Sequence, residues 1–184
     1  MSKLHIFDVD GTILDSMKMW ETLGSTYLKS KGCREFEKVD RIIASMTLDE
    51  AALYMKREYK LTEGPETIRR EITAVIEDQY ANVIRPFPET MELLHRIAKT
   101  GETMVILSIS DRKCITLAMK RLGIYDYFSR IYTDADFQIS KRDPEIFRKV
   151  CELHHVIPAE AIVYDDADYA INAAKEAGCQ VMAF

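Results

Sequence analysis

The sequence predicts an α/β protein with a parallel sheet as its core and an inserted α-helical cap. Short segments that are rich in Val, Ile or Tyr alternate with longer segments of helical patterning, and this alternation is typical of a parallel sheet. The segment from about 15 to 84 differs, because it contains several amphipathic helical patterns and no convincing strand. A helical block therefore interrupts the α/β pattern after the first strand.

The predicted strands are short and apolar, and signals at their ends mark the helices between them. The first strand, 4–7, ends at an acidic loop in which Gly11 is the expected turn residue. The other strands are expected at 103–107, 129–133, 161–164 and 180–184. The expected helices begin at Pro88, after Asp111, at Pro144 and at about Asp168, and three of them end at Gly101, Gly123 and Gly178.

The helical block carries signals of its own. Thr47 and Glu50 have the spacing of a capping box, and a second helix is expected to start near Pro65. The expected hinges lie near 14–15 and 85–86. We therefore predict a core domain made of residues 1–14 and 85–184 and a helical cap made of residues 15–84.

Composition argues against several classes of protein. The chain has 184 residues, 47% of them hydrophobic, which suits one domain or a compact core with a modest insertion. A net charge of -5 without a Lys/Arg cluster argues against a nucleic acid or an anionic membrane as partner. The four cysteines form no CxxC pair, and we expect no signal peptide, because the apolar stretch at 4–7 is too short for one and no long apolar run follows it. We expect a cytoplasmic protein with reduced thiols; the oligomeric state is left open.

Two pairs of carboxylates follow predicted buried strands. Asp8 and Asp10 come directly after the first strand, and Asp165 and Asp166 follow the strand at 161–164. In open α/β sheets the carboxyl ends of the strands border the ligand crevice. Carboxylates gathered there raise one another's pKa unless a cation compensates their charge, and Mg²⁺ prefers such oxygen ligands. The pattern therefore predicts a magnesium site, although each pair alone is common in turns.

The segment from Asp8 to Thr12 reads Asp-Val-Asp-Gly-Thr, and with it the chain resembles the haloacid dehalogenase-like (HAD) hydrolase superfamily. The resemblance covers nearly the whole length and is strongest to the β-phosphoglucomutase-like branch. It implies a Rossmann-like parallel sheet core with an inserted helical cap. It also implies that Asp8 is the nucleophile and Asp10 the general acid/base, and that both bind the metal, Asp10 through its carbonyl.

The remaining motifs of the family appear in the expected order. Ser108 ends the apolar segment 105–107 and, by resemblance, donates a hydrogen bond to a phosphoryl oxygen. Lys141 precedes a helix that begins with proline, and by resemblance it offsets the charge of the nucleophile and the phosphoryl group. Many family members have proline directly after this lysine, whereas here Arg142 stands there and Pro144 follows two places later.

The fourth motif places two further aspartates at the metal. Aligning the Ala-Ala-Lys run at 173–175 assigns Asp166 as a metal ligand, and Asp165 takes the position where capped members often have Glu. A shorter carboxylate at position 165 can also reach the metal through water. Asp168 is expected to be a helix cap.

These residues imply a Mg²⁺-dependent phosphatase that hydrolyses a small phosphorylated metabolite, such as a sugar phosphate, through an aspartyl-phosphate on Asp8. A phosphomutase would use the same residues and stays an alternative. Asp10 argues against a dehalogenase, because a halide leaving group needs no proton. A phosphonate hydrolase would need a Schiff-base lysine in the cap, where none stands out. A non-catalytic, receiver-like phospho-acceptor module is the alternative of a different class, although such modules are shorter and uncapped.

Overall fold

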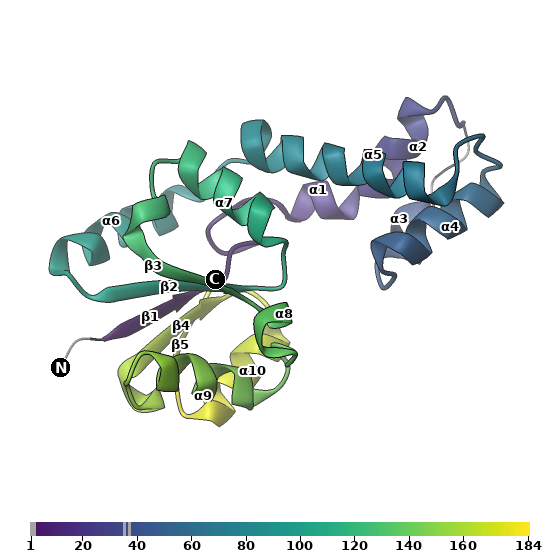
Figure 1. Ribbon diagram of the computed structural model, residues 1–184. Coiled ribbons are helices and arrows are strands. Elements are labelled where there is room, and N and C mark those ends of the chain that lie inside the picture. Colours follow the sequence, from purple (N-terminus) through teal and green to yellow (C-terminus); the bar gives the residue numbers. More distant parts are fainter. Residues whose placement is uncertain (1–2, 35, 37) are drawn as a thin grey trace. The chain divides into compact units, whose positions relative to one another are not determined.

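The computed structural model describes residues 3–34, 36 and 38–184, and the chain divides into two compact units (Figure 1). The α/β unit consists of the residues up to Asp15 together with residues 84–184. The helical unit consists of residues 16–83. The role of the helical unit as a cap stays a prediction.

The α/β unit contains a five-stranded parallel sheet in the order β3-β2-β1-β4-β5. This confirms the fold class that the alternation of strands and helices predicts. Each predicted strand agrees with an observed one to within one residue at either end. The strands are β1 Leu4–Phe7, β2 Thr103–Ser108, β3 Phe128–Thr133, β4 Ala161–Asp165 and β5 Gln180–Ala183.

Helices cover both faces of this sheet, which explains why its central strand is buried throughout. All four residues of β1 are buried. Helices α6 and α7 lie on one face and α9 and α10 on the other (Figure 1). Their bounds are α6 Pro88–Thr100, α7 Arg112–Arg121, α9 Pro144–Leu153 and α10 Asp168–Ala177, and a short helix that the sequence did not predict, α8, spans Asp134–Phe137.

Most of the predicted helix ends are observed, but one cap is not. Gly101 follows α6 in the left-handed conformation, and the Asp111 carboxylate accepts from the backbone N–H groups of Lys113 and Cys114 in the first turn of α7. The expectation that Asp168 caps α10 was wrong, because the capping position belongs to Ala167 and Asp168 is already helical. The Asp165 carboxylate accepts the Ala167 N–H at 3.0 Å and fixes the chain one residue earlier.

Helix-end signals and ion pairs shape the helical unit. The capping box of Thr47 and Glu50 is present, as predicted, and Pro65 is the first residue of its longest helix. Lys31 forms ion pairs of 2.7 Å with both Glu63 and Glu71. The elements are α1 Met17–Glu21, α2 Leu23–Ser30, α3 Val39–Ile43, α4 Leu48–Glu58, α5 Pro65–Asp78 and a π-helical turn at Gln79–Val83.

The two segments through which the α/β unit continues into the helical unit run side by side. The Asp15 N–H donates to the Arg85 carbonyl at 2.9 Å, and the Phe87 N–H donates to the Ile13 carbonyl at 3.0 Å. The buried Thr90 hydroxyl adds a bond of 2.8 Å to the Thr12 carbonyl. These bonds tie the loop that follows β1 to the start of α6.

Candidate active site

The order of the strands brings together the two predicted acidic segments, the one at Asp8 and Asp10 and the one at Asp165 and Asp166. β1 pairs with β2 on one side and with β4 on the other, and Phe7 lies opposite Tyr164. The pairing continues one residue further, because the Asp8 N–H donates to the Tyr164 carbonyl at 2.9 Å. Asp8 and Asp165 therefore lie at neighbouring strand ends, where open α/β sheets bind ligands.

The loop after β1 is a tight turn that needs glycine. The N–H groups of Ile13 and Leu14 donate to the Val9 carbonyl at 2.9 and 2.8 Å. Gly11 has a φ of +87°, and a Cβ added to it would lie 2.1 Å from Oδ2 of Asp166. A glycine at this position lets the Asp166 carboxylate lie against the backbone of the Asp8 to Thr12 segment.

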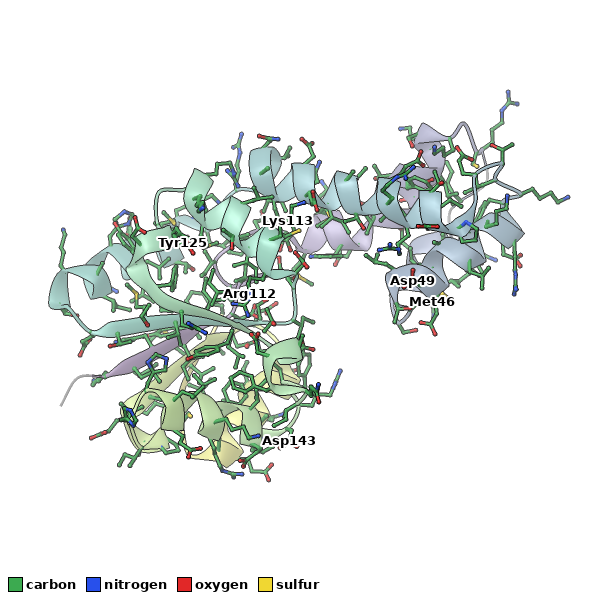
Figure 2. The ribbon with its side chains drawn as sticks, in the orientation of Figure 1. Met46, Asp49, Arg112, Lys113, Tyr125 and Asp143 are labelled. Atoms are coloured by element: carbon green, nitrogen blue, oxygen red, sulfur yellow. The ribbon has the colours of Figure 1, made fainter. Side chains whose placement is uncertain are left out.

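Lys141 links two of the carboxylates. Its Nζ lies 2.7 Å from Oδ1 of Asp8 and 2.7 Å from Oδ2 of Asp165. All three side chains are buried. Lys141 comes from the loop before α9, whose turn is closed by a bond of 2.9 Å from the Asp143 N–H to the Ser140 carbonyl; Figure 2 labels Asp143 at the start of that helix. Lys141 and the two carboxylates form a buried ionic contact, in which the removal of either partner would leave a buried charge without compensation.

The carboxylates around Lys141 carry more negative charge than the single ammonium group offsets, and the shifted pKa values of these side chains reflect this excess. Burial raises the pKa of Asp8 from 3.8 to about 7, against the opposing charge of Lys141 and with a further increase from Asp165. Burial also disfavours the charged form of Lys141, but attraction to Asp8 and Asp165 outweighs it and keeps the lysine pKa above its usual value. Burial raises the pKa of Asp166 as well, with Asp165 adding to the shift. A single ammonium group does not neutralise so many carboxylates.

The donor set fits a hard divalent cation. Among the described residues, Asp8, Asp165 and Asp166 can each present one oxygen such that these atoms all lie within 4.8 Å of one another. All the side-chain donors are carboxylate oxygens, which suit Mg²⁺. Both oxygens of Asp165 already accept hydrogen bonds, one from Lys141 and one from the Ala167 N–H. Asp165 thus already has a protein partner for each of its two oxygens.

Asp10 and Ser108 lie at the same edge of the sheet but outside that group of three. The Ser110 hydroxyl donates a short hydrogen bond to Oδ2 of Asp10. The Ser110 N–H in turn donates to Oγ of Ser108 at 3.1 Å. Ser108 is buried at the end of β2, whereas Asp10 is half-buried. Sequence reasoning missed the contact between Ser110 and Asp10, and the only signal for it was the position of Ser110 two residues after the predicted Ser108.

The two arginines near these residues have partners of their own. Arg112, labelled in Figure 2 at the start of α7, pairs with the Asp136 carboxylate. Arg142, the cation directly after Lys141, lies over the ring of Tyr169 with its Cζ 4.1 Å from the ring centroid. Lys141, and not Arg142, contacts Asp8, and the sequence did not indicate the stacking of Arg142 on Tyr169.

The fold places a group of three carboxylates, Asp8, Asp165 and Asp166, at the carboxyl ends of two central strands of a parallel α/β sheet. The family model of haloacid dehalogenase-like hydrolases matches residues 5–184. The chain therefore belongs to the haloacid dehalogenase-like hydrolase family, as its motifs predict. Within the described residues, no helix has the length and apolar character needed to cross a bilayer.

Known proteins resemble this chain over nearly its whole length. A phosphorylated carbohydrates phosphatase of Thermotoga maritima is 21% identical over 95% of this chain and 81% of that protein. A phosphoglycolate phosphatase of Vibrio vulnificus is 26% identical over 96% of this chain and 81% of that protein. The crystal structure of a putative β-phosphoglucomutase from Thermotoga maritima superposes with a TM-score of 0.85 at 20% identity, covering 98% of this chain and 84% of that one.

Proposed function

We propose that the protein is a Mg²⁺-dependent phosphatase that hydrolyses a small phosphomonoester through an aspartyl-phosphate on Asp8. The observation that carries the proposal is the buried Asp8 carboxylate, held by Lys141 at 2.7 Å beside Asp165 and Asp166. Membership of a hydrolase family and relatives that are named as phosphatases support hydrolysis of a phosphate ester.

Asp8 is the nucleophile in this proposal. Lys141 contacts its Oδ1, so we assign Oδ2 to the in-line attack on phosphorus. A bond forms between this oxygen and phosphorus while the bond from phosphorus to the ester oxygen breaks. The Lys141 ammonium offsets the charge that Asp8 and the phosphoryl group bring together, and Ser108 donates to a phosphoryl oxygen.

Asp10 moves the protons. It gives one to the departing alkoxide, and it later takes one from the water that attacks the aspartyl-phosphate, so the carboxyl group returns to its starting state. The Ser110 hydroxyl, which contacts Oδ2 of Asp10, helps to hold this side chain in one orientation. Proton delivery of this kind suits an alcohol leaving group and is not needed for a halide.

Asp8, Asp166 and the Asp10 carbonyl would hold Mg²⁺, with Asp165 acting on Lys141 and through water. When bound, the ion lowers the repulsion between an anionic nucleophile and a phosphate dianion. The donor set and the close approach of Gly11 to Asp166 support this choice.

The net charge and the names of the relatives support a proposal for the substrate class. We propose a small phosphorylated metabolite, such as a sugar phosphate, in the cytoplasm, with the helical unit serving as the cap that selects it. The net charge of -5 speaks against a nucleic acid as substrate.

A phosphate-release screen tests this function. A panel of sugar phosphates and other phosphomonoesters is incubated with Mg²⁺ and the protein, Asp8→Asn, or Asp126→Asn as a control that removes an exposed carboxylate. We expect release by the protein and by Asp126→Asn but not by Asp8→Asn. Absence of release from every ester would refute the proposal. Isomerisation of glucose 1-phosphate faster than its hydrolysis would replace the phosphatase with a phosphomutase.

A further inference from the structure

Lys141 lies in a loop, yet its Nζ must be placed accurately to contact two carboxylates at once. Its Nζ lies 2.7 Å from each of two carboxylates that end or follow different strands. Strands fix the backbones of Asp8 and Asp165, whereas Lys141 lies between α8 and α9. Small displacements of charged groups in a site lower the rate strongly. A contact in addition to the ion pair would therefore help to hold this loop in place.

The next residue supplies such a contact. The guanidinium of Arg142 lies over the ring of Tyr169, with Cζ 4.1 Å from the ring centroid, well within the range of a cation–π interaction. Tyr169 belongs to the first turn of α10, directly after the segment that contains Asp165 and Asp166. The stacked pair thus connects the lysine loop to the acidic segment that Lys141 must reach.

The surroundings of the ring support this reading. Tyr169 is half-buried, and burial raises the pKa of its hydroxyl, with Lys141 opposing the shift and Asp165 and Asp8 adding to it. The ring is therefore within electrostatic range of the ion pair. The Arg142 N–H also donates to Oγ of Ser140 at 3.2 Å, which tightens the turn that presents Lys141.

We propose that Arg142 and Tyr169 form a clamp that positions Lys141 between Asp8 and Asp165. Both are positioning residues, because they act through Lys141. The effect of the clamp on turnover rests on the proposed phosphatase function, whereas its effect on Lys141 does not.

Chemical labelling of Lys141 tests the clamp without any substrate. The folded protein is treated briefly with an N-hydroxysuccinimide ester of acetic acid, and acetylation of each lysine is measured by peptide mass spectrometry, with exposed Lys175 as the internal reference. We expect Arg142→Ala and Tyr169→Leu to raise the labelling rate of Lys141 about two- to fivefold, the range expected from an exposed cation–π contact. Tyr169→Phe keeps the ring face and should label like the unchanged protein.

A matched control excludes a general effect of losing an arginine. Arg148 lies on α9, pairs with Glu145 at 3.5 Å and donates to the Glu176 carbonyl at 3.1 Å, at the opposite end of α10 from Tyr169, so Arg148→Ala removes an exposed guanidinium nearby without touching the clamp. Lys141 labelling should not change in this variant. The clamp is refuted if Lys141 labels equally in the unchanged protein, Arg142→Ala and Tyr169→Leu, or if Arg148→Ala raises labelling as much as they do.

Kinetics then separates positioning from substrate binding. If the clamp acts through Lys141, Arg142→Ala and Tyr169→Leu should lower kcat by a similar factor and leave KM nearly unchanged, and Tyr169→Phe should retain the activity. An Arg142→Ala variant with a raised KM, an unchanged kcat and unreactive Lys141 would show that Arg142 binds substrate, and would overturn the proposal. If no phosphatase activity exists, the proposed function fails while the labelling still decides on the clamp.

Discussion

Nζ of Lys141 lies 2.7 Å from Oδ1 of Asp8, and both side chains are almost completely buried. Removing one partner of such a pair leaves the other charge without compensation, which costs about 3–5 kcal/mol. We expect Lys141→Met to lower the free energy of unfolding by about this amount in metal-free buffer at about pH 8, where Asp8 is ionised, as measured by urea denaturation, and Mg²⁺ to restore part of the loss. Lys175→Met, at an exposed site, is the control. Equal stability of the two variants would contradict the ion pair.

The raised pKa of Asp8 makes stability and metal binding depend on pH. The Asp8 pKa of about 7 in the folded, metal-free chain exceeds the ordinary value of 3.8. Between these two pH values the folded state therefore keeps a proton on Asp8 that the unfolded state has lost. The contribution of this group to stability is therefore present below about pH 4 and is lost as the pH rises through about 7.

Mg²⁺ competes with that same proton. We expect the affinity for Mg²⁺ to rise about tenfold between about pH 6 and pH 8, with release of about one proton per ion at the lower pH. Calorimetric titration in buffers of different ionisation enthalpy measures both quantities. An affinity that does not vary over this interval would show that the metal does not replace a proton on Asp8.

Substitutions at two glycines with similar backbone angles can distinguish the cost of backbone strain from the cost of a steric clash with Asp166. Gly11 and Gly101 have φ values of +87° and +74°, but a Cβ on Gly11 would lie 2.1 Å from Oδ2 of Asp166, whereas a Cβ on Gly101 would meet nothing within 4 Å. Gly101→Ala should therefore cost about 1–2 kcal/mol of stability from strain alone. Gly11→Ala should cost more and should also weaken Mg²⁺ binding, as followed by urea denaturation and metal titration. Similar effects of Gly11→Ala and Gly101→Ala on stability and on Mg²⁺ binding would mean that the Asp166 carboxylate does not require a glycine at position 11.

Asp10 should matter most for leaving groups that need a proton. General acid catalysis contributes about 10²- to 10⁴-fold, and a nitrophenolate can leave without it. We expect Asp10→Asn to lower the single-turnover rate of ester cleavage far more for an alkyl phosphate than for p-nitrophenyl phosphate, and Ser110→Ala to act in the same direction more weakly. An equal loss for both substrates would exclude Asp10 as the general acid.

Local chemistry made much of the fold predictable. Leu4 to Phe7 is a run of buried residues that ends at Asp8, and such a run has few alternatives to a central strand. Helix ends were equally clear where a side chain or a glycine defines them, as at Asp111 and Gly101. Asp168 misled the prediction because the Asp165 side chain holds the Ala167 N–H, a contact that depends on the loop conformation.

The site was predictable only in part. Asp8 and Asp165 both follow apolar segments, so the sequence predicts that they lie at strand ends. The observed pairing of β1 with β4 then brings the two residues together. The contact between Ser110 and Asp10 and the stacking of Arg142 on Tyr169 depend on how loops fold against one another. Neither leaves a periodic pattern in the sequence, and for that reason the sequence could not supply them.

The most direct test of the central claim is to trap phosphate on Asp8. The protein is mixed with Mg²⁺ and an excess of a phosphomonoester that it cleaves, quenched in acid and reduced with borohydride, which converts an aspartyl-phosphate to homoserine. Peptide mass spectrometry then locates the change. We predict homoserine at position 8 in the unchanged protein and in Asp126→Asn, and none in Asp8→Asn. Turnover of the ester with homoserine at another aspartate, or with no protein-bound phosphate at any time point, would contradict the assignment of Asp8 as the nucleophile.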